Sequence, residues 1–483
     1  MPANFLLPTS AEYARVMPEI ILSIAGTLVL FLAAFSEERK SFFAPLTLAS
    51  LAAALFAALS ANSDQGAAFQ NLLIVDGFST FFRVVTIGVG ILTVLTASEY
   101  LDREQAHAPE FYALVLFSIA GQSIMASANE LIMIFIGLEI SSIASYILAG
   151  FLRDDEGNNE SALKYCLLGS FATAFMLYGV AWIYGSTGTT RLVDIRGAIS
   201  GNADLSVIGI AIALIFVGFA FKISAAPFQA WAPDVYQGAP APVSAFLSVG
   251  PKAAAFAVLL RVFLTAFGNV SQVWMPFVWG CALATMIVGN FAAILQSNIK
   301  RMLAYSSIAH AGYVLVALTA HSDTGAAAAM FYLAAYAFTN VGAFAVVTYF
   351  ARKGEEYVKI DDFAGLSQRK PAMAAMLTIF LLSLIGVPLT GGFFGKFYIF
   401  KAALDSNLVW LTVLGLLNSA VAAYYYLRIL VVMYFKDPAE SVANLPAPGL
   451  GIQIAVFGSA LGTLLLGIFP SAILEFASKA ALR

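Results

Sequence analysis

The amino-acid sequence predicts an all-α polytopic membrane protein with about 14 transmembrane helices. Of its 483 residues, 60% are hydrophobic and only 11% are charged, whereas soluble domains carry roughly 25% charged residues. Because about 20 apolar residues cross a bilayer as a helix, long uncharged runs predict spans. Among the runs without Asp, Glu, Lys or Arg are 41–63, 111–129, 165–190, 262–299, 324–351 and 441–474. The alternating polarity of membrane β-strands is absent, which argues against a porin-like barrel.

Short loops connect the predicted spans, and no linker separates a second soluble domain. In chain order the predicted helices are 16–35, 41–62, 76–98, 110–128, 130–152, 159–185, 205–233 and 239–264, then 272–297, 299–320, 325–351, 371–405, 407–434 and 449–476. The seventh and twelfth are long and interrupted, by Pro227 and by Pro388 with Gly391 and Gly392. Proline frees an upstream carbonyl and glycine permits unwinding. Unwound backbone survives in a membrane only beside protein or water, so both breaks are predicted to border hydrated cavities.

Residues 210–265 and 376–430 follow the same plan of an apolar helix, a break with proline, and a second helix closed by Arg261 or Arg428. With the helices before them, each fits a unit of about five helices, and tandem units of odd number enter the membrane from opposite sides, as in the inverted repeats of transporters. The predicted organisation is a three-helix segment at 1–108, a first repeat at 109–265, a second repeat at 266–435 and a C-terminal helix at 436–483.

Lysine and arginine are unevenly shared between the two sides that alternating spans define. One side collects 13 of them and the other 6. The richer side includes Arg39, Lys40 and the cluster Arg352, Lys353, Lys359, Arg369 and Lys370. Short cytoplasmic loops carry this excess. The sequence therefore predicts a bacterial inner-membrane protein with the 352–370 loop in the cytoplasm and both termini in the periplasm.

Composition also argues against several classes of partner and cofactor. The net charge of −3 offers no basic surface for nucleic acid. The two cysteines form no CxxC or iron–sulfur spacing, and two of the three histidines lie near loops, which leaves too few candidates for bis-histidine haem ligation. We therefore expect no redox cofactor and no metal in this chain.

Four ionisable side chains fall deep within predicted spans: Glu139, Lys222, Lys252 and Lys396. Glu139 lies about nine residues into its helix, which at about 1.5 Å per residue is near the bilayer midplane. An ionisable group at such depth is costly and is by default a functional candidate. All four reach a similar depth on four helices, so they are predicted to form a row parallel to the membrane.

Two interpretations of these charges remain open, namely proton transfer and structural ion pairing. Pairing satisfies Glu139 with one lysine but leaves the others without an acidic partner at mid-depth, which favours proton transfer. Lysine suits a relay because burial disfavours its charged form and a nearby carboxylate restores it. Arginine stays protonated and cannot act in this way.

Two further side chains are weaker candidates. Lys164 lies only one or two turns inside its helix, so snorkelling to the interface explains it as well as function does. His310 lies mid-helix near Ser306, Ser307 and Tyr313. It could link the buried lysines through water, or it could be a hydrogen-bonded packing residue. Glu19, Asp76 and Arg83 in the early helices are interpreted as packing or subunit-contact charges.

Four segments carry a family likeness, namely FKISAAPFQAWAPDVYQGAPAPVSAFLSVGPKAAAFAVLLR at 221–261, LEISSIASYILAGF at 138–151, SALKYCLLGSF at 161–171 and GVPLTGGFFGKFYIF at 386–400. These segments resemble the antiporter-like subunits of respiratory complex I (NADH-quinone oxidoreductase). Within that group, WAPDVYQGAP is similar to the subunit N family, the counterpart of mitochondrial subunit 2. The resemblance covers essentially the whole chain.

The resemblance implies a proton-translocating membrane subunit in a complex that carries FMN, iron–sulfur clusters and a quinone elsewhere. It implies Glu139 and Lys222 as a charge pair, Lys252 as the central connector and Lys396 as the exit-side lysine, with the homologous antiporter-like subunits and the lipid bilayer as partners. One departure is Gln229, where family members often carry a titratable histidine. A subunit of a multi-subunit Na⁺/H⁺ antiporter, and a purely structural membrane scaffold, remain the alternatives.

Overall fold

The computed structural model describes residues 7–35, 42–106, 109–201, 204–351, 353–355, 357–443 and 445–481. Within these residues, 12 helices are long and apolar enough to cross a membrane. Two shorter apolar helices, Met17–Ala33 and Pro371–Ile385, accompany them. The all-α membrane fold class predicted from the sequence is therefore confirmed.

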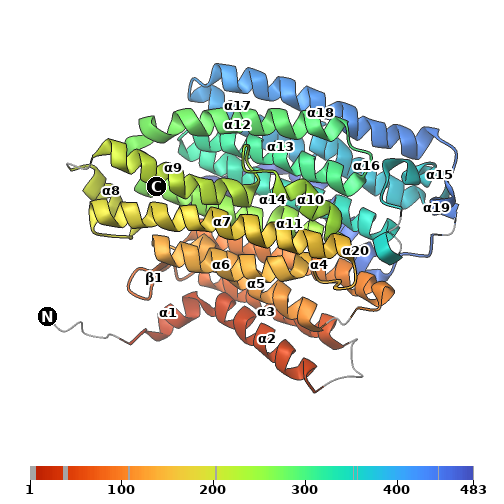
Figure 1. The fold of residues 1–483 in the computed structure, drawn as a ribbon, viewed down its shortest axis with the longest axis horizontal. Coiled ribbons are helices and arrows are strands. Elements are labelled where there is room, and N and C mark those ends of the chain that lie inside the picture. The colour runs from red at the N-terminus through yellow and green to blue at the C-terminus, as the bar shows by residue number, and fades with distance from the viewer. Residues whose placement is uncertain are drawn as a thin grey trace.

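The N-terminal part forms one edge of the helical array (Figure 1). A two-stranded antiparallel hairpin connects α3 to α4, with Gly66 paired to Val75. Asp76 caps α4 by accepting the Ser79 backbone N–H at 2.7 Å. The elements are α1 (Ser10–Arg15), α2 (Met17–Ala33), α3 (Phe43–Ala61), β1 (Gly66–Ala68), β2 (Leu73–Val75) and α4 (Gly77–Glu104).

The middle of the chain supplies the helices that surround the buried lysines. They are α5 (Pro109–Ser127), α6 (Leu131–Ala149), α7 (Glu156–Thr187), α8 (Leu192–Ile199), α9 (Leu205–Ile223), α10 (Trp231–Gly238), α11 (Ala241–Arg261), α12 (Ser271–Ile294), α13 (Ile299–Thr319) and α14 (Asp323–Phe350). A π-helical turn, Val262–Ala266, prolongs α11, and a 3₁₀ turn, Gly268–Val270, precedes α12.

In the C-terminal part, α17 and α18 form the opposite edge, farthest from α2 (Figure 1), whereas α20 and α21 pack against α4 and α14. Its helices are α15 (Leu366–Arg369), α16 (Pro371–Ile385), α17 (Gly391–Asp405), α18 (Val409–Phe435), α19 (Glu440–Ala443), α20 (Leu450–Ile468) and α21 (Pro470–Ala480). Two 3₁₀ turns, Lys353–Glu355 and Ile360–Phe363, lie between α14 and α15.

Three central helices form the core of the array. The apolar windows of Ala241–Ala266, Ile299–Thr319 and Asp323–Phe350 are 100%, 94% and 94% buried by the rest of the chain. Small residues permit close helix packing in membranes, and Gly289 of α12 illustrates this. A Cβ at Gly289 would lie 2.5 Å from the backbone nitrogen of Ala309 on α13. The most enclosed helices are therefore those that carry Lys252 and His310.

Both predicted breaks are present. The first separates α9 from α10 and contains Pro227, and the second separates α16 from α17 and contains Pro388. Gly391 and Gly392 open the second half-helix, and a Cβ on Gly392 would lie 2.0 Å from the carbonyl oxygen of Ser383. Glycine at 392 is thus required for the two half-helices to approach. The division into repeats at 108, 265 and 435 stays a prediction.

Several elements of the structure differ from those predicted from the sequence. The predicted helix 449–476 is wrong as a single helix, because it ends at Ile468 and a second helix starts at Pro470. A proline disfavours the α conformation of the residue before it, and Phe469 accordingly leaves the helical region. The short helices α1 and α8 and the β-hairpin were not predicted, since they are too short to show a clear period.

The first and last helices lie at the same end of the array. Arg15 of α1 donates to the carbonyl of Ala67 in the hairpin, and Phe476 of α21 stacks on Phe81 near the start of α4. The backbone N–H of Gly354 instead bonds Glu104 at the far end of α4. This is the arrangement that an even number of spans requires. Residues 1–6, 482 and 483, like Arg39, Lys40 and Arg352, lie outside the described residues.

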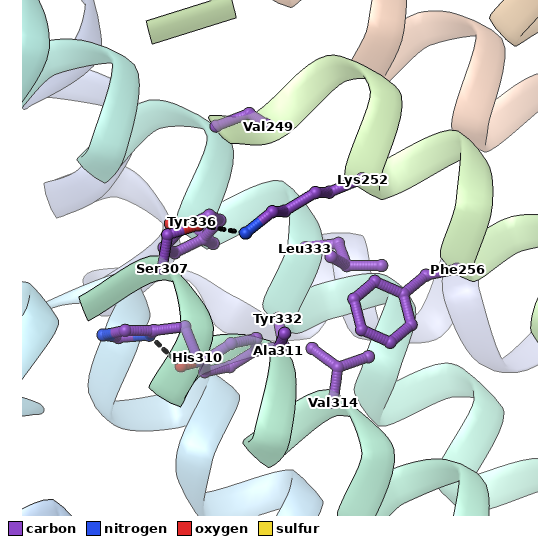
Figure 2. A pocket seen from close by; sticks show the side chains of 10 residues that line it. All are labelled: Val249, Lys252, Phe256, Ser307, His310, Ala311, Val314, Tyr332, Leu333 and Tyr336. Atoms are coloured by element: carbon purple, nitrogen blue, oxygen red, sulfur yellow. Dashed lines mark hydrogen bonds between the residues drawn. The ribbon is translucent and has the colours of Figure 1, made fainter. Parts of the chain in front are cut away.

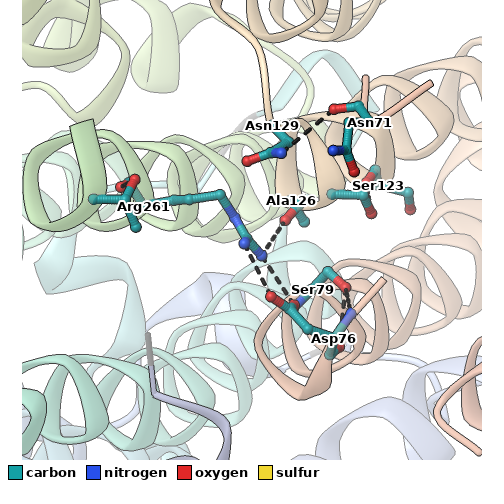
Figure 3. Close-up of polar contacts among 9 residues, drawn as sticks. Asn71, Asp76, Ser79, Ser123, Ala126, Asn129 and Arg261 are labelled. Carbon is teal, nitrogen blue, oxygen red and sulfur yellow. Dashed lines mark hydrogen bonds and ion pairs between the residues drawn. The ribbon is translucent and has the colours of Figure 1, made fainter. Parts of the chain in front are cut away.

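The early charges form packing ion pairs, as interpreted from the sequence. Arg83 is fully buried and pairs with Glu19 at 2.7 Å. Asp76 accepts two hydrogen bonds from Arg261, both 2.9 Å long. Figure 3 shows this bidentate pair beside the carbonyl of Ala126, which Arg261 also contacts. The pair ties the end of α11 to the starting point of α4.

Candidate functional site

Lys222 occupies the last turn of α9, immediately before the first break. Its side chain is 3% exposed. The ammonium donates to the hydroxyl of Ser142 at 2.8 Å and to that of Tyr165 at 3.1 Å. These partners come from α6 and α7, so three helices converge on this lysine. Its neighbours are hydroxyl groups, which can both accept and donate a proton.

Glu139 lies one turn before Ser142 on α6 but forms no ion pair with Lys222 among the described contacts. It is half-buried, and its Oε1 atom is buried without a hydrogen-bond partner in the described part of the chain. The adjoining surface of α6 exposes Ile136, Ile140 and Ile143. The expected ion pair between Glu139 and Lys222 is therefore absent in this conformation. Glu139 lies at the boundary between the interior of the helical array and its lateral surface.

Lys252 lies at the centre of α11 and is 3% exposed. Its ammonium donates to Ser307 of α13 at 2.6 Å and lies 5.5 Å from the ring centre of Tyr236. Pro251 leaves the carbonyl of Leu247 without its helical donor, and the hydroxyl of Tyr236 bonds that carbonyl at 3.2 Å. Tyr236 thus repairs the proline defect and covers the lysine.

His310 lies one turn beyond Ser307 on α13 and is 4% exposed. Its Nδ1 atom is hydrogen-bonded to the hydroxyl of Tyr332, and its Nε2 atom lies 3.2 Å from the hydroxyl of Tyr426. Lys252 and His310 line one internal cavity with Ser307, Tyr332 and Tyr336 (Figure 2). The cavity offers about 10 Å³ for a water centre, which is room for about one molecule.

Lys396 lies on α17, beyond the second break, and is 6% exposed. Its ammonium donates to the carbonyls of Leu384 and Ile385 at 2.8 and 2.9 Å and to Ser419 at 2.8 Å. Leu384 is the residue whose carbonyl Pro388 frees. Lys396 therefore caps the end of α16, so a protein side chain satisfies the carbonyl that the proline frees. A similar repair occurs at the first break, where Trp231 donates to the carbonyl of Phe221 at 2.9 Å.

Helix α13 joins the surroundings of Lys252 and Lys396. Ser307 contacts Lys252, His310 follows one turn later, and the ring of Tyr313 lies 4.9 Å from the Lys396 ammonium. Six residues of helix span about 9 Å. The path between Lys222 and Lys252 is different, because the Tyr165 ring stacks on Trp231 with centroids 4.4 Å apart. Hydroxyl and imidazole groups lie between Lys252 and Lys396, whereas aromatic rings lie between Lys252 and Lys222.

Lys164 has a different environment from the three deep lysines. It pairs with Glu160 at 2.6 Å and with Asp234 of α10 at 2.7 Å. Asp234 also pairs with Arg301 of α13 at 2.7 Å. The Lys164 side chain is 38% exposed, so this cluster is a partly solvated tie between three helices. Gln229, in the first break, keeps its Oε1 atom buried without a partner in the described part of the chain.

The structure supplies partners that the sequence analysis did not single out, above all Ser142, Tyr165, Ser419, Tyr332 and Tyr426. They lie 22 to 116 residues away from the lysine or histidine that they contact. One local signal existed, since Ser142 follows Glu139 by one helical turn. Tyr165 directly follows Lys164, the lysine considered the weaker candidate.

Comparison with known proteins places the chain in a family. A family model described as NADH:quinone oxidoreductase/Mrp antiporter, TM, matches residues 128–422. The protein named NADH-quinone oxidoreductase subunit N 1 from Solibacter usitatus is 64% identical over 469 residues, covering 97% of this chain and 96% of that protein. The chain belongs to the subunit N family of NADH-quinone oxidoreductase. It is thus an antiporter-like membrane-arm subunit of a bacterial enzyme complex.

Solved structures agree with this family membership. A chain of respiratory complex I from Thermus thermophilus has a TM-score of 0.81 at 34% identity, covering 96% of this chain and 99% of that one. A chain of the Mrp complex from a Dietzia species has a TM-score of 0.85 at 21% identity, covering 98% and 97%. The second likeness shows a shared fold alone. The antiporter alternative is therefore less well supported than membership of the subunit N family.

Proposed function

We propose that this subunit N chain moves protons through Glu139, Lys222, Lys252 and Lys396, coupled to NADH oxidation and quinone reduction elsewhere in the complex. The observation that carries the proposal is a set of three lysines, each at most 6% exposed, that have no carboxylate partner among the described ion pairs. A purely structural role favours paired buried charges. Hydroxyl and carbonyl neighbours instead allow each lysine to change its protonation state without stranding a counter-charge.

The proposed route passes along α13 between the last two lysines. Lys252, Ser307 and His310 border the cavity that can hold about one water, and Tyr332 and Tyr426 flank the imidazole. A histidine or a tyrosine hydroxyl can receive and release a proton within such a chain. We assign no proton role to Lys164, because two carboxylates already pair with it.

Partners and orientation follow from the same features. The half-exposed Glu139 beside an isoleucine surface favours a neighbouring membrane subunit at this face of α6, because an ionisable group facing lipid is costly. FMN, iron–sulfur clusters and the quinone belong to other subunits of the proposed complex. Lys and Arg are in excess at the end of the helical array where residues 353–370 lie. This excess favours a cytoplasmic position for 353–370 and periplasmic termini.

Replacement of Lys252 by Met in the assembled complex tests the proposal. Proton uptake into vesicles and coupled quinone reduction should both fall, while NADH oxidation by an artificial acceptor should persist. Lys401→Met is the matched control, since Lys401 is an exposed lysine on α17, and it should leave all three rates unchanged. A Lys252→Met complex that pumps at the control rate would favour the scaffold alternative. Uptake that depends on sodium would favour the antiporter alternative.

A further inference from the structure

A surface groove between α16 and α20 combines positive charge with an apolar wall. Its volume is about 290 Å³, and its lining consists of Arg369, Lys370, Pro371, Ala372, Met373, Pro448, Gln453 and Phe457. No acidic side chain is among them. The groove lies at the end of the helices where the loop cations gather, and it belongs to neither buried lysine cluster. Its chemistry therefore points to an anionic ligand.

Several of the cations at this end of the described chain are held by partners. Lys436 pairs with Asp361 at 2.8 Å, and Arg301 pairs with Asp234 at 2.7 Å. Arg428 donates to the carbonyls of Ile294 and Gln296. By contrast, Arg369 and Lys370 have no ion pair and no side-chain hydrogen bond among the described contacts. Two free cations thus border one groove.

The start of α16 adds to the positive potential. Lys370 is its N-cap, no side chain caps it, and no acidic residue lies in its first turn. Pro371 at the first position has no N–H, so the free donors at this end are the backbone N–H groups of Ala372 and Met373, which lack helical partners and attract anions. The α16 N-terminus therefore faces the same groove as the two free cations, and each of these features favours a phosphate group.

The groove opens onto an apolar stripe along α20. Ile454, Phe457, Leu461 and Leu465 are all exposed at helical spacing, so one side of α20 faces outward along the membrane. Basic pockets between helices at the cytoplasmic surface suit anionic lipid headgroups. We propose that this groove binds an anionic phospholipid, with its phosphodiester on Arg369, Lys370 and the α16 N-terminus and its acyl chains along α20.

Lipid titration of the delipidated full-length chain, followed by native mass spectrometry, tests this site. Phosphatidylglycerol should bind better than phosphatidylcholine with the same acyl chains. In Arg369→Gln/Lys370→Gln the affinity for phosphatidylglycerol should fall roughly 30-fold, as expected for two surface cations. Arg153→Gln/Lys359→Gln removes the same charge from exposed positions outside the groove and should change the affinity little. An equal loss in both double variants would overturn the site.

Two further experiments test whether the shape of the groove is needed besides its charge, and whether the ligand is a lipid or a free phosphate compound. Gln453→Trp fills the groove without changing charge, and Gln453 is exposed, so the variant should fold yet lose phosphatidylglycerol binding. Retained binding in this variant would overturn the groove as the site. Glycerol 3-phosphate carries the phosphate without acyl chains and should bind weakly at matched concentration. Binding as tight as that of the lipid would overturn the lipid as occupant.

Discussion

Replacement of Lys396 by Met should destabilise the chain much more than replacement of Lys252 by Met. Both lysines are almost fully buried and both donate to one serine hydroxyl. Lys396 also caps two carbonyls, those of Leu384 and Ile385. An unsatisfied buried polar group costs about 1–3 kcal/mol, so the two carbonyls add roughly 2–6 kcal/mol to the effect of Lys396→Met. The relief from removing a buried charge is common to both variants and cancels in the comparison.

The assay is the fraction of detergent-solubilised chain that stays monodisperse after heating, measured by size-exclusion chromatography. Lys396→Met should lose its monodisperse peak at a clearly lower temperature than Lys252→Met, and Lys401→Met should behave as the unaltered chain. Equal midpoints for Lys396→Met and Lys252→Met would refute the capping role. The hydrogen bonds from Lys396 to the α16 carbonyls would then contribute nothing measurable to the stability of the chain.

Three other perturbations have defined outcomes. Asp76→Asn should destabilise the chain by about 3 kcal/mol in the same assay, at the low end for breaking a buried pair, because the Asp76 side chain is 27% exposed. Burial raises the pKa of Asp76, but the charge and hydrogen bonds of Arg261 outweigh burial and hold that pKa below its ordinary value. The stability that the Asp76–Arg261 pair contributes should therefore be lost as the pH falls through the lowered pKa. Asp64→Asn, in an exposed pair with Arg15, should change stability by less than about 1 kcal/mol. An equal loss of stability in Asp76→Asn and Asp64→Asn would contradict a stabilising role of the Asp76–Arg261 pair. In a background without Cys166 and Cys281, Lys353→Cys should react with impermeant thiol reagents only in inverted vesicles, and labelling of intact cells would reverse the topology. Glu139→Gln should assemble but slow proton uptake and quinone reduction together, and unchanged coupled rates would remove Glu139 from the pathway.

The spans, the breaks and the buried lysines could be predicted from the sequence, because each is a local pattern. A run of apolar residues has the length of a bilayer crossing, and a proline or a lysine within it stands out whatever its neighbours are. The short elements α1, α8 and the β-hairpin lack such a pattern. Pro470 is a local signal for the split between α20 and α21, because a proline disfavours the helical conformation of the residue before it.

The partners of the lysines could not be predicted in the same way. Ser142 and Tyr165 lie 80 and 57 residues before Lys222, and nothing in one sequence shows that they meet it. The family resemblance implied a charge pair between Glu139 and Lys222, whereas packing places the hydroxyl groups of Ser142 and Tyr165 around the Lys222 ammonium. The capping of Leu384 by Lys396 required the geometry of the break, although the proline that frees this carbonyl was visible from the start.

Proton uptake per electron in vesicles containing the Lys222→Arg complex tests the central claim most directly. Arginine keeps the positive charge but does not release its proton, so the variant should assemble and should oxidise NADH with an artificial acceptor at the normal rate. The proposed relay predicts that its quinone-coupled proton uptake falls strongly. An assembled Lys222→Arg complex that takes up the normal number of protons per electron would contradict a titrating lysine at position 222.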